Sequence, residues 1–261
     1  MNVIEQEKYD ERFYDSQAAG SLRSAKIVLP LVKNLIQPAS VLDVGCGVGA
    51  WLKVWKDNLG VSDIIGIDGE YVSRESLQIP EKNFISKDLK GSFALNRKFD
   101  LVMSLEVGEH LPHETSAQFI SNLVSHGNIV LFSAAMLHQT GTYHINEQLP
   151  EFWASLFMKH DYMPVDIIRD KIWNDDTVEW WYRQNILLYV HRDILNRHPL
   201  LMEKAKHTNP DCLVRIHPLL WKYRNEEVEI RSHWISFIRW KLAFLTKPFK
   251  KKKNGAAKTR S

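Results

Sequence analysis

The stretch VLDVGCGVGAW, residues 41–51, decides the fold. An apolar strand runs directly into three glycines at alternate positions, Gly45, Gly47 and Gly49, and a helix is expected to follow them. Glycine lets the backbone turn sharply and approach a ligand, because no Cβ stands in the way. The helix after such a turn presents its N-terminal N–H groups to the same place. The sequence therefore predicts a ligand-binding turn between a buried strand and a helix.

Short apolar segments rich in Val, Ile and Phe recur along the chain and alternate with helical patterns. They span residues 40–45, 63–68, 83–86, 99–104 and 128–133. Continuous apolar strands separated by helices are typical of a parallel sheet that is buried on both faces. Helical apolar spacing predicts helices over 20–36 and 113–125. Two further strand candidates, 163–169 and 185–190, are joined by a polar, Trp-rich loop without a helix, which predicts an antiparallel edge hairpin.

Length and composition favour one main domain, since 261 residues with 44% hydrophobic side chains can bury one substantial core. We expect this domain over residues 1–192, a helical C-terminal extension over 193–246 and a disordered basic tail over 247–261. The N-terminal residues lack a signal-peptide pattern, and no apolar run approaches the roughly 18 residues of a membrane span. Cys46 and Cys212 are far apart and outside any CxxC pair, so a disulfide framework is not expected. These features predict a cytoplasmic protein.

The charge is distributed unevenly along the chain. Residues 231–261 hold ten of the 34 Lys and Arg residues and none of the 31 acidic ones, which leaves 24 basic against 31 acidic residues before them. A net negative charge on the folded domain argues against a nucleic-acid-binding surface, so no nucleic-acid partner is expected. The apolar arc of WISFIRWKLAFL, residues 234–245, precedes a lysine run. It fits either peripheral contact with an anionic membrane or a helix docked on the domain.

Two kinds of ligand fit the glycine-rich turn. Gly45, Gly47 and Ala50 satisfy the G-x-G-x-x-A pattern of dinucleotide folds, which leaves an NAD-dependent oxidoreductase or a non-catalytic nucleotide-binding module as a rival. However, Asp43 precedes the glycines, where it would repel a pyrophosphate but favour an ammonium group. Asp68 and Asp88 follow the next two strands and can accept hydrogen bonds from ribose hydroxyls and an adenine amine. A cation, a ribose and an adenine together describe S-adenosylmethionine.

The segments VLDVGCGVGAW, GIDGEY, SKDL and FDLVMSLEVGEHL resemble, in order and spacing, the motifs of class I S-adenosylmethionine-dependent methyltransferases. The resemblance covers about residues 20–190 and implies an α/β, Rossmann-like, seven-stranded, mostly parallel sheet with an antiparallel last strand. It also implies that Asp43 and the three glycines line the methionine end of the cofactor. Asp68 would then contact the ribose, and Asp88 with Leu89 would contact the adenine. The full set expected to bind the cofactor is Asp43, Gly45, Cys46, Gly47, Gly49, Asp68, Gly69, Asp88, Leu89 and Leu105.

A possible metal site follows the fourth strand. Glu106, Glu109 and His110 have the spacing i, i+3, i+4, which puts them on one face if the segment is helical, and His144 would emerge at the neighbouring strand end. Two carboxylates and two imidazoles can hold Mg²⁺ or Mn²⁺. This E-x-x-E-H followed by His resembles the metal site of small-RNA 2′-O-methyltransferases and ubiquinone-pathway O-methyltransferases. Alternatively, Glu109 and His110 position the next helix, and a histidine acts alone as general base. Either way, His110, Glu109 and His144 are the predicted catalytic residues.

The acceptor is expected at an aromatic segment, residues 172–185, which includes Trp180 and Trp181. Aromatic faces flanked by polar groups suit stacking against a sugar ring, and they also suit core packing. Residues 132–153 and 172–185 together resemble methyltransferases of glycan-modifying systems, which implies O-methylation of a sugar hydroxyl, with Asn146, Trp180 and Trp181 as substrate contacts. Methylation of a small phenol or quinone precursor, or of RNA ribose, remains an alternative.

Overall fold

The computed structural model describes residues 11–245, which divide into two compact units, one up to His217 and one from Pro218 onward. The first unit contains a seven-stranded sheet in the order β3-β2-β1-β4-β5-β7-β6. The strands are β1 (Ser40–Val44), β2 (Asp63–Asp68), β3 (Phe84–Ser86), β4 (Leu101–Leu105), β5 (Ile129–Ser133), β6 (Tyr162–Val165) and β7 (Leu187–His191). Strands β1 to β5 pair in parallel, whereas β7 is antiparallel to both β5 and β6. The predicted α/β fold with an antiparallel last strand is confirmed.

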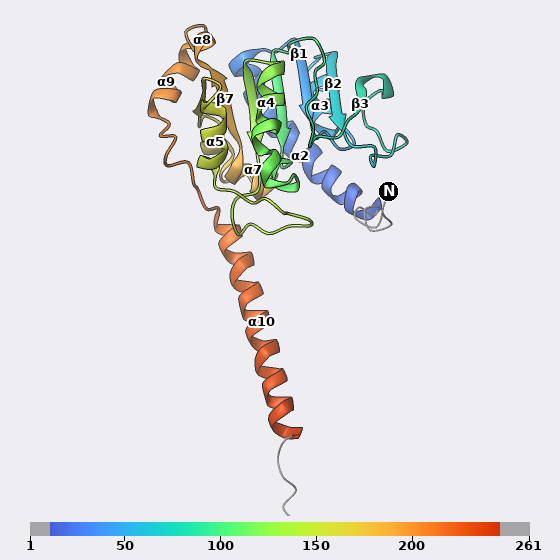
Figure 1. Ribbon diagram of the computed structural model, residues 1–261, viewed down its shortest axis with the longest axis vertical. Coiled ribbons are helices and arrows are strands. Elements are labelled where there is room, and N and C mark those ends of the chain that lie inside the picture. The colour runs from blue at the N-terminus through green and yellow to red at the C-terminus, as the bar shows by residue number, and fades with distance from the viewer. Residues whose placement is uncertain (1–10, 246–261) are drawn as a thin grey trace, which may run out of the picture. The chain divides into compact units, whose positions relative to one another are not determined.

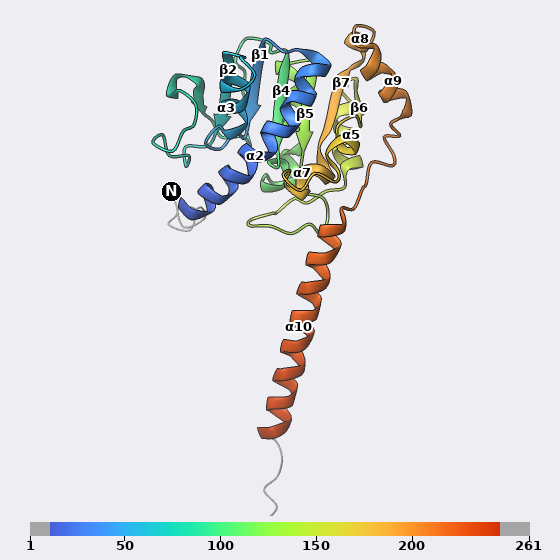
Figure 2. The same cartoon turned by 180° about the vertical axis from the view of Figure 1, so that it is seen from behind.

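Helices cover both faces of this sheet, as Figures 1 and 2 show from opposite sides. The helices of the first unit are α2 (Glu11–Ile36), α3 (Ala50–Asp57), α4 (Ser116–His126), α5 (Pro150–Met158), α6 (Arg169–Ile172), α7 (Trp180–Asn185), α8 (Arg192–Leu195) and α9 (Pro199–His207), with 3₁₀ turns η1 (Glu81–Asn83), η2 (Gly108–His110) and η3 (His113–Thr115). The second unit contains α10 (Pro218–Leu245). In the described part of the chain, no helix combines the length and apolar character needed to cross a bilayer.

Two hydrophobic cores lie on the two faces of the sheet, because successive strand residues point to opposite sides. Leu101 and Met103 of β4 face one core, where α2 contributes Val28 and Leu29. Val102, between them, faces the other core, which is filled mainly by side chains of α4 and α5. Burial on both faces explains why these strands are almost entirely apolar, as expected for a parallel sheet.

The sheet order places the predicted site. The chain leaves β1 toward β2 on one side and returns to β4 on the other, so the switch point of the topology, where α/β sheets bind their ligands, lies at the carboxyl ends of β1 and β4. Because β7 runs antiparallel, its first residue lies at this same edge, with Leu187 paired to Phe132 near the end of β5. Residues that follow β1, β2, β4 and β5 and residues that precede β7 therefore meet at one edge.

The segment between the last two strands differs from the prediction. Instead of a helix-free loop it contains α6 and α7, and β6 ends at Val165 rather than at Arg169. Ile167 and Ile168 are apolar because they pack into the first core around the start of α6, not because they continue the strand. Similarly, Asn185 ends α7, and β7 starts two residues later. Short apolar runs do not distinguish a strand from a buried turn by periodicity alone.

The predicted boundary between residues 192 and 193 also differs from the division in the structure, where the first unit continues to His217. Leu201 and Leu213 are buried, and the buried guanidinium of Arg169 donates a 2.8 Å hydrogen bond to the carbonyl oxygen of Leu213. These contacts tie residues 193–217 to the sheet domain. The predicted disordered tail, 247–261, lies outside the described residues.

Candidate functional site

The glycine-rich turn between β1 and α3 has a backbone that side chains would disfavour. Gly45, Gly47 and Gly49 have φ angles of 84°, 54° and 86°, in the left-handed region. A Cβ on Gly45 would lie 2.3 Å from the side chain of Val107, and one on Gly49 would lie 2.9 Å from Ile79. Gly45 and Gly49 are therefore required both by their dihedral angles and by close packing, whereas Gly47, with nothing within 4 Å of an added Cβ, is required by its dihedral angle.

Asp43 and Asp68, which the sequence predicts to face S-adenosylmethionine, are buried beside this turn. Asp43 is 2% exposed, and burial, followed by the nearby charge of Asp68, raises its pKa to about 8. Burial also raises the pKa of the Cys46 thiol. Leu105, at the end of β4, is buried as well. A cation bound next to Asp43 would stabilise the ionised carboxylate, because an opposite charge favours the charged form.

Asp68 at the end of β2 ties the turn to its neighbour. Its carboxylate accepts hydrogen bonds from the backbone N–H groups of Gly47 at 2.6 Å and Gly69 at 2.7 Å, and from the hydroxyl of Tyr71 at 2.5 Å. Burial raises its pKa, while these three donors oppose that shift. Tyr71 was missed by the sequence analysis, although GEY directly after Asp68 is the signal that could have suggested it.

Asp88 and Leu89 follow β3 at the same edge of the sheet. Asp88 is exposed and accepts a 3.0 Å hydrogen bond from the backbone N–H of Lys90, whereas Leu89 is 6% exposed. The structure therefore lines up Asp43, Asp68 and Asp88 at the carboxyl ends of three adjacent strands, β1, β2 and β3.

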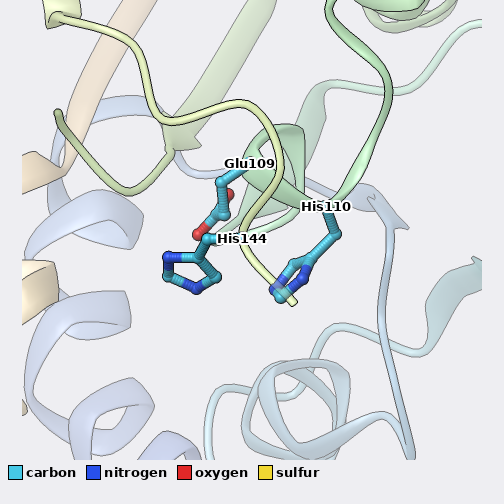
Figure 3. Close-up of side chains that lie close together, drawn as sticks. All are labelled: Glu109, His110 and His144. Atoms are coloured by element: carbon cyan, nitrogen blue, oxygen red, sulfur yellow. The ribbon is translucent and has the colours of Figure 1, made fainter. Parts of the chain in front are cut away.

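Glu109, His110 and His144 gather into one cluster (Figure 3). One potential ligand atom from each lies within 4.8 Å of the others. Glu109 and His110 belong to the 3₁₀ turn η2, and His144 comes from the loop after β5. The helical face predicted for Glu106, Glu109 and His110 is wrong, since η2 begins at Gly108 and Glu106 precedes it with a φ of 55°.

The two histidines are oriented by acceptors on their Nδ1 atoms. Nδ1 of His144 lies 2.9 Å from a carboxylate oxygen of Glu147, and Nδ1 of His110 lies 3.3 Å from the carbonyl oxygen of Tyr143. A nitrogen that faces such an acceptor carries the proton, which leaves the lone pair on Nε2. Metal-binding histidines have this arrangement, with a carboxylate or carbonyl on the second nitrogen.

Glu109 is fully buried, and neither of its carboxylate oxygens has a hydrogen-bond partner among the described residues. Burial, followed by the charge of Glu106, raises its pKa well above the usual range. A buried carboxyl group without donors is costly unless it binds a cation or keeps its proton. The chemistry of this cluster, one carboxylate and two imidazoles, therefore fits a divalent cation such as Mg²⁺ or Mn²⁺.

The predicted acceptor residues have different surroundings. The side-chain amide of Asn146 is buried and used internally: it donates to the carbonyl oxygen of Gly108 and to Ser116, and it accepts from Gln148. This position supports η2 beside the cluster. Trp180 and Trp181 are partly exposed in α7, with ring centroids 5.7 Å apart, and Trp181 also packs against the first core.

Comparison with known families now identifies the domain. The profile described as a methyltransferase domain matches residues 14–186. The chain belongs to this family. The predicted enzyme class, an S-adenosylmethionine-dependent methyltransferase, is confirmed, and the rival nicotinamide oxidoreductase is set aside.

Solved structures with a similar fold include several methyltransferases. The plantazolicin methyltransferase BpumL, solved with S-adenosylhomocysteine and a desmethyl analogue, is 19% identical over 73% of this chain and 92% of its own, with a TM-score of 0.52. The methyltransferase domain of bacterial CtHen1 is 18% identical over 64% and 98%, with a TM-score of 0.47. Magnesium protoporphyrin IX methyltransferase from Synechocystis PCC 6803 is 21% identical over 70% and 88%, with a TM-score of 0.48. A search of curated proteins gives no match.

Proposed function

We propose that this methyltransferase transfers a methyl group to a hydroxyl of a sugar, with a divalent cation held by Glu109, His110 and His144. The observation that carries the cation is the pair of buried, unpartnered oxygens of Glu109 beside two imidazoles whose Nδ1 atoms are already engaged. Glu106, three residues before Glu109, is the fourth proposed ligand. When bound, the cation lowers the pKa of an acceptor hydroxyl and so makes its oxygen a better nucleophile.

The residues of the turn hold the donor for a direct transfer. Asp43 and the glycines are proposed to bind the methionine end, Asp68 the ribose, and Asp88 with Leu89 the adenine, together with Cys46, Gly69 and Leu105. The acceptor oxygen attacks the methyl carbon, the carbon–sulfur bond breaks, and sulfur keeps its electron pair as S-adenosylhomocysteine leaves. The hydroxyl proton, made more acidic by the cation, leaves to water; in the alternative without a cation, Nε2 of His110 is the group proposed to take it.

A sugar acceptor is supported by the resemblance of residues 132–153 and 172–185 to glycan-modifying methyltransferases. The partly exposed Trp180 and Trp181 offer aromatic surface at the edge of the sheet where β7 begins, and such surface suits the apolar face of a sugar ring. A phenol or quinone precursor and RNA ribose are the competing acceptors.

The test is release of S-adenosylhomocysteine from the full-length protein with Mg²⁺ or Mn²⁺ and a panel of acceptors: methyl-free oligosaccharides, a catechol and a short RNA. We expect release with a sugar, none after EDTA, and recovery when the cation is restored. Turnover with the catechol or the RNA alone would overturn the sugar assignment. Full turnover after exhaustive chelation would leave the alternative in which His110 acts as general base without a cation.

We also propose that α10 brings the protein to an anionic membrane surface. From residue 231 onward the sequence contains Lys and Arg but no acid, and the side chains of Trp234, Ile235 and Ile238 are exposed. Basic residues near an anionic surface contribute about 1 kcal/mol each, and exposed aromatic and aliphatic groups add apolar contact. Removal of residues 246–261 should lower binding to phosphatidylglycerol vesicles and leave turnover unchanged; equal vesicle binding by both forms would contradict the proposal.

A further inference from the structure

Three amide side chains, Gln139, Gln184 and Asn185, form a buried network at the edge of the sheet next to the cation cluster. They are 6%, 1% and 4% exposed. Gln139 comes from the loop after β5, and Gln184 and Asn185 end α7 just before β7. Burying several amide groups together is costly unless their hydrogen bonds are satisfied. The group to which these amides donate therefore indicates their role.

That group is the carboxylate of Glu106. Nδ2 of Asn185 lies 3.2 and 3.4 Å from the two carboxylate oxygens, and Nε2 of Gln139 donates to one of them at 3.2 Å. These donors are 79 and 33 residues away from Glu106 in the sequence. Glu106 thus differs from Glu109, three residues later, whose oxygens receive no hydrogen bond from residues 11–245.

The hydrogen bonds of the network fix which end of each amide is the oxygen and which is the NH₂ group. Oε1 of Gln139 accepts from Nδ2 of Asn185 at 2.9 Å, from Nε2 of Gln184 at 3.2 Å and from the backbone N–H of Met136 at 3.3 Å. Because its oxygen faces three donors, the NH₂ group of Gln139 must point the other way, toward Glu106. Oδ1 of Asn185 in turn accepts from Gln184, whose own oxygen accepts from the backbone of His217.

The backbone of Glu106 is also fixed by hydrogen bonds. Its N–H donates to the carbonyl oxygen of Ser133 at 2.9 Å and lies 3.2 Å from the hydroxyl of the same residue. With a φ of 55°, Glu106 occupies the left-handed region, which is unfavourable for a residue with a side chain. Such strain persists where the surroundings fix the residue, and it concentrates at functional sites.

We propose that Gln139 and Asn185 are positioning residues that hold the carboxylate of Glu106 toward the Glu109, His110 and His144 cluster, so that Glu106 completes the cation site. This inference rests on the proposed function, since it assigns a role to these amides only if the cluster binds a cation. Groups that orient ligands through hydrogen bonds affect metal affinity by about 10- to 100-fold when they are removed.

The experiment is calorimetric titration of the full-length protein with Mn²⁺ in the presence of S-adenosylhomocysteine. Asn185→Leu removes the amide that contacts both carboxylate oxygens, and Gln139→Met removes the second amide donor while keeping nearly the length and volume of glutamine. We expect each variant to bind Mn²⁺ about 10- to 100-fold more weakly, with unchanged affinity for S-adenosylhomocysteine.

Asn122→Leu is the matched control. Asn122 is buried to the same degree as Asn185, but its amide serves Gly91, Phe93 and Gln118, away from the cluster. This variant should lower the melting temperature as Asn185→Leu does and leave Mn²⁺ affinity unchanged. A general loss of stability would affect Asn122→Leu and Asn185→Leu alike, whereas a positioning role affects only the latter.

The outcomes separate this inference from the proposed function. Folded Asn185→Leu and Gln139→Met proteins with wild-type Mn²⁺ affinity would overturn the positioning role, while the cation site would stand if Glu109→Gln still abolished binding. Failure of the wild-type protein to bind Mn²⁺ at all would overturn both.

Discussion

Asp68 and Glu109 are both buried acids at the same edge of the sheet, and their surroundings are opposite. Asp68 accepts hydrogen bonds from Gly47, Gly69 and Tyr71. Glu109 has no donor on either oxygen among the described residues. Burial raises the pKa of both. At Asp68 three hydrogen bonds oppose this shift, whereas at Glu109 the charge of Glu106 adds to it and only the nearby backbone N–H groups of Glu109 and Ala135 oppose it.

The difference separates a carboxylate whose hydrogen-bond donors the protein supplies from one that we propose a cation completes. Three donors already orient the carboxylate of Asp68, which is the proposed contact to the ribose. A buried carboxylate without donors loses its hydration and gains nothing in return, which is compatible with a folded protein only if a proton or a cation replaces the water. The half of the site proposed to bind S-adenosylmethionine is therefore preorganised, and the acceptor half is proposed to depend on a cation.

The largest expected effect is that of Glu109→Gln, which removes the charge but keeps the shape. We expect kcat to fall about 10²- to 10³-fold, as when a group that stabilises developing charge is removed, and Mn²⁺ binding to be lost. Affinity for S-adenosylhomocysteine should stay at the wild-type value, because the donor contacts lie on other strands. Calorimetry with each ligand and a rate assay measure these effects; retention of Mn²⁺ binding by the variant would remove Glu109 from the site.

Asp68→Ala tests the other half and should have a smaller effect. Loss of hydrogen bonds to a charged group is expected to weaken S-adenosylhomocysteine binding by about 1–3 kcal/mol, with Mn²⁺ affinity unchanged. Asp63→Ala, at the exposed start of the same strand and paired with Arg97, is the control that should leave both affinities intact. If Asp68→Ala binds S-adenosylhomocysteine as the wild-type protein does, the ribose assignment is wrong.

Asp43 predicts a pH dependence of the free energy of unfolding. Its pKa is about 8 in the folded protein against 3.8 for an ordinary aspartate, so between these values the folded state keeps a proton that the unfolded state has released. Stability should therefore fall as pH rises through this window, by at most about 1.4 kcal/mol per pH unit, and level off above it. Urea denaturation between pH 5 and 9 should show this contribution in the wild-type protein and its loss in Asp43→Asn; parallel curves would contradict it.

The sequence predicted the parallel part of the sheet well, because strands buried on both faces are apolar runs that end at glycines and acids. It failed at Ile167 and Ile168, whose burial comes from packing at a helix start and is indistinguishable from a strand in the residue pattern. The compact unit continues past the predicted boundary to His217, where the hydrogen bond from Arg169 to Leu213 joins residues 44 apart.

The candidate site divides in the same way. Asp43, Gly45 and Asp68 could be predicted, because a short motif fixes both their identity and their place at the strand ends. Gln139 and Asn185 could not be predicted, because amide residues in loops carry no pattern of their own. Their role depends on β7 entering the sheet next to β5 with the opposite direction, which brings the end of α7 to Glu106.

The smallest expected effect concerns Gly141, which lies in the loop that carries His144. A Cβ on Gly141 would lie 2.3 Å from the imidazole ring of His144, so alanine would have to push the ring away from its position next to His110. The hydrogen bond between Nδ1 of His144 and Glu147 resists this displacement, and the cluster should lose geometry rather than a ligand. We expect Gly141→Ala to weaken Mn²⁺ binding about tenfold, the low end of the range for removing a group that supports a metal ligand.

Gly91→Ala is the matched control, because the nearest atom to its added Cβ is 4.0 Å away. Since Gly141 contacts neither Asp68 nor the glycine-rich turn in this way, affinity for S-adenosylhomocysteine should be unchanged. A Gly141→Ala protein with wild-type Mn²⁺ affinity would show that the position of the His144 ring does not limit cation binding, and would leave Glu109 and His110 as the ligands that matter.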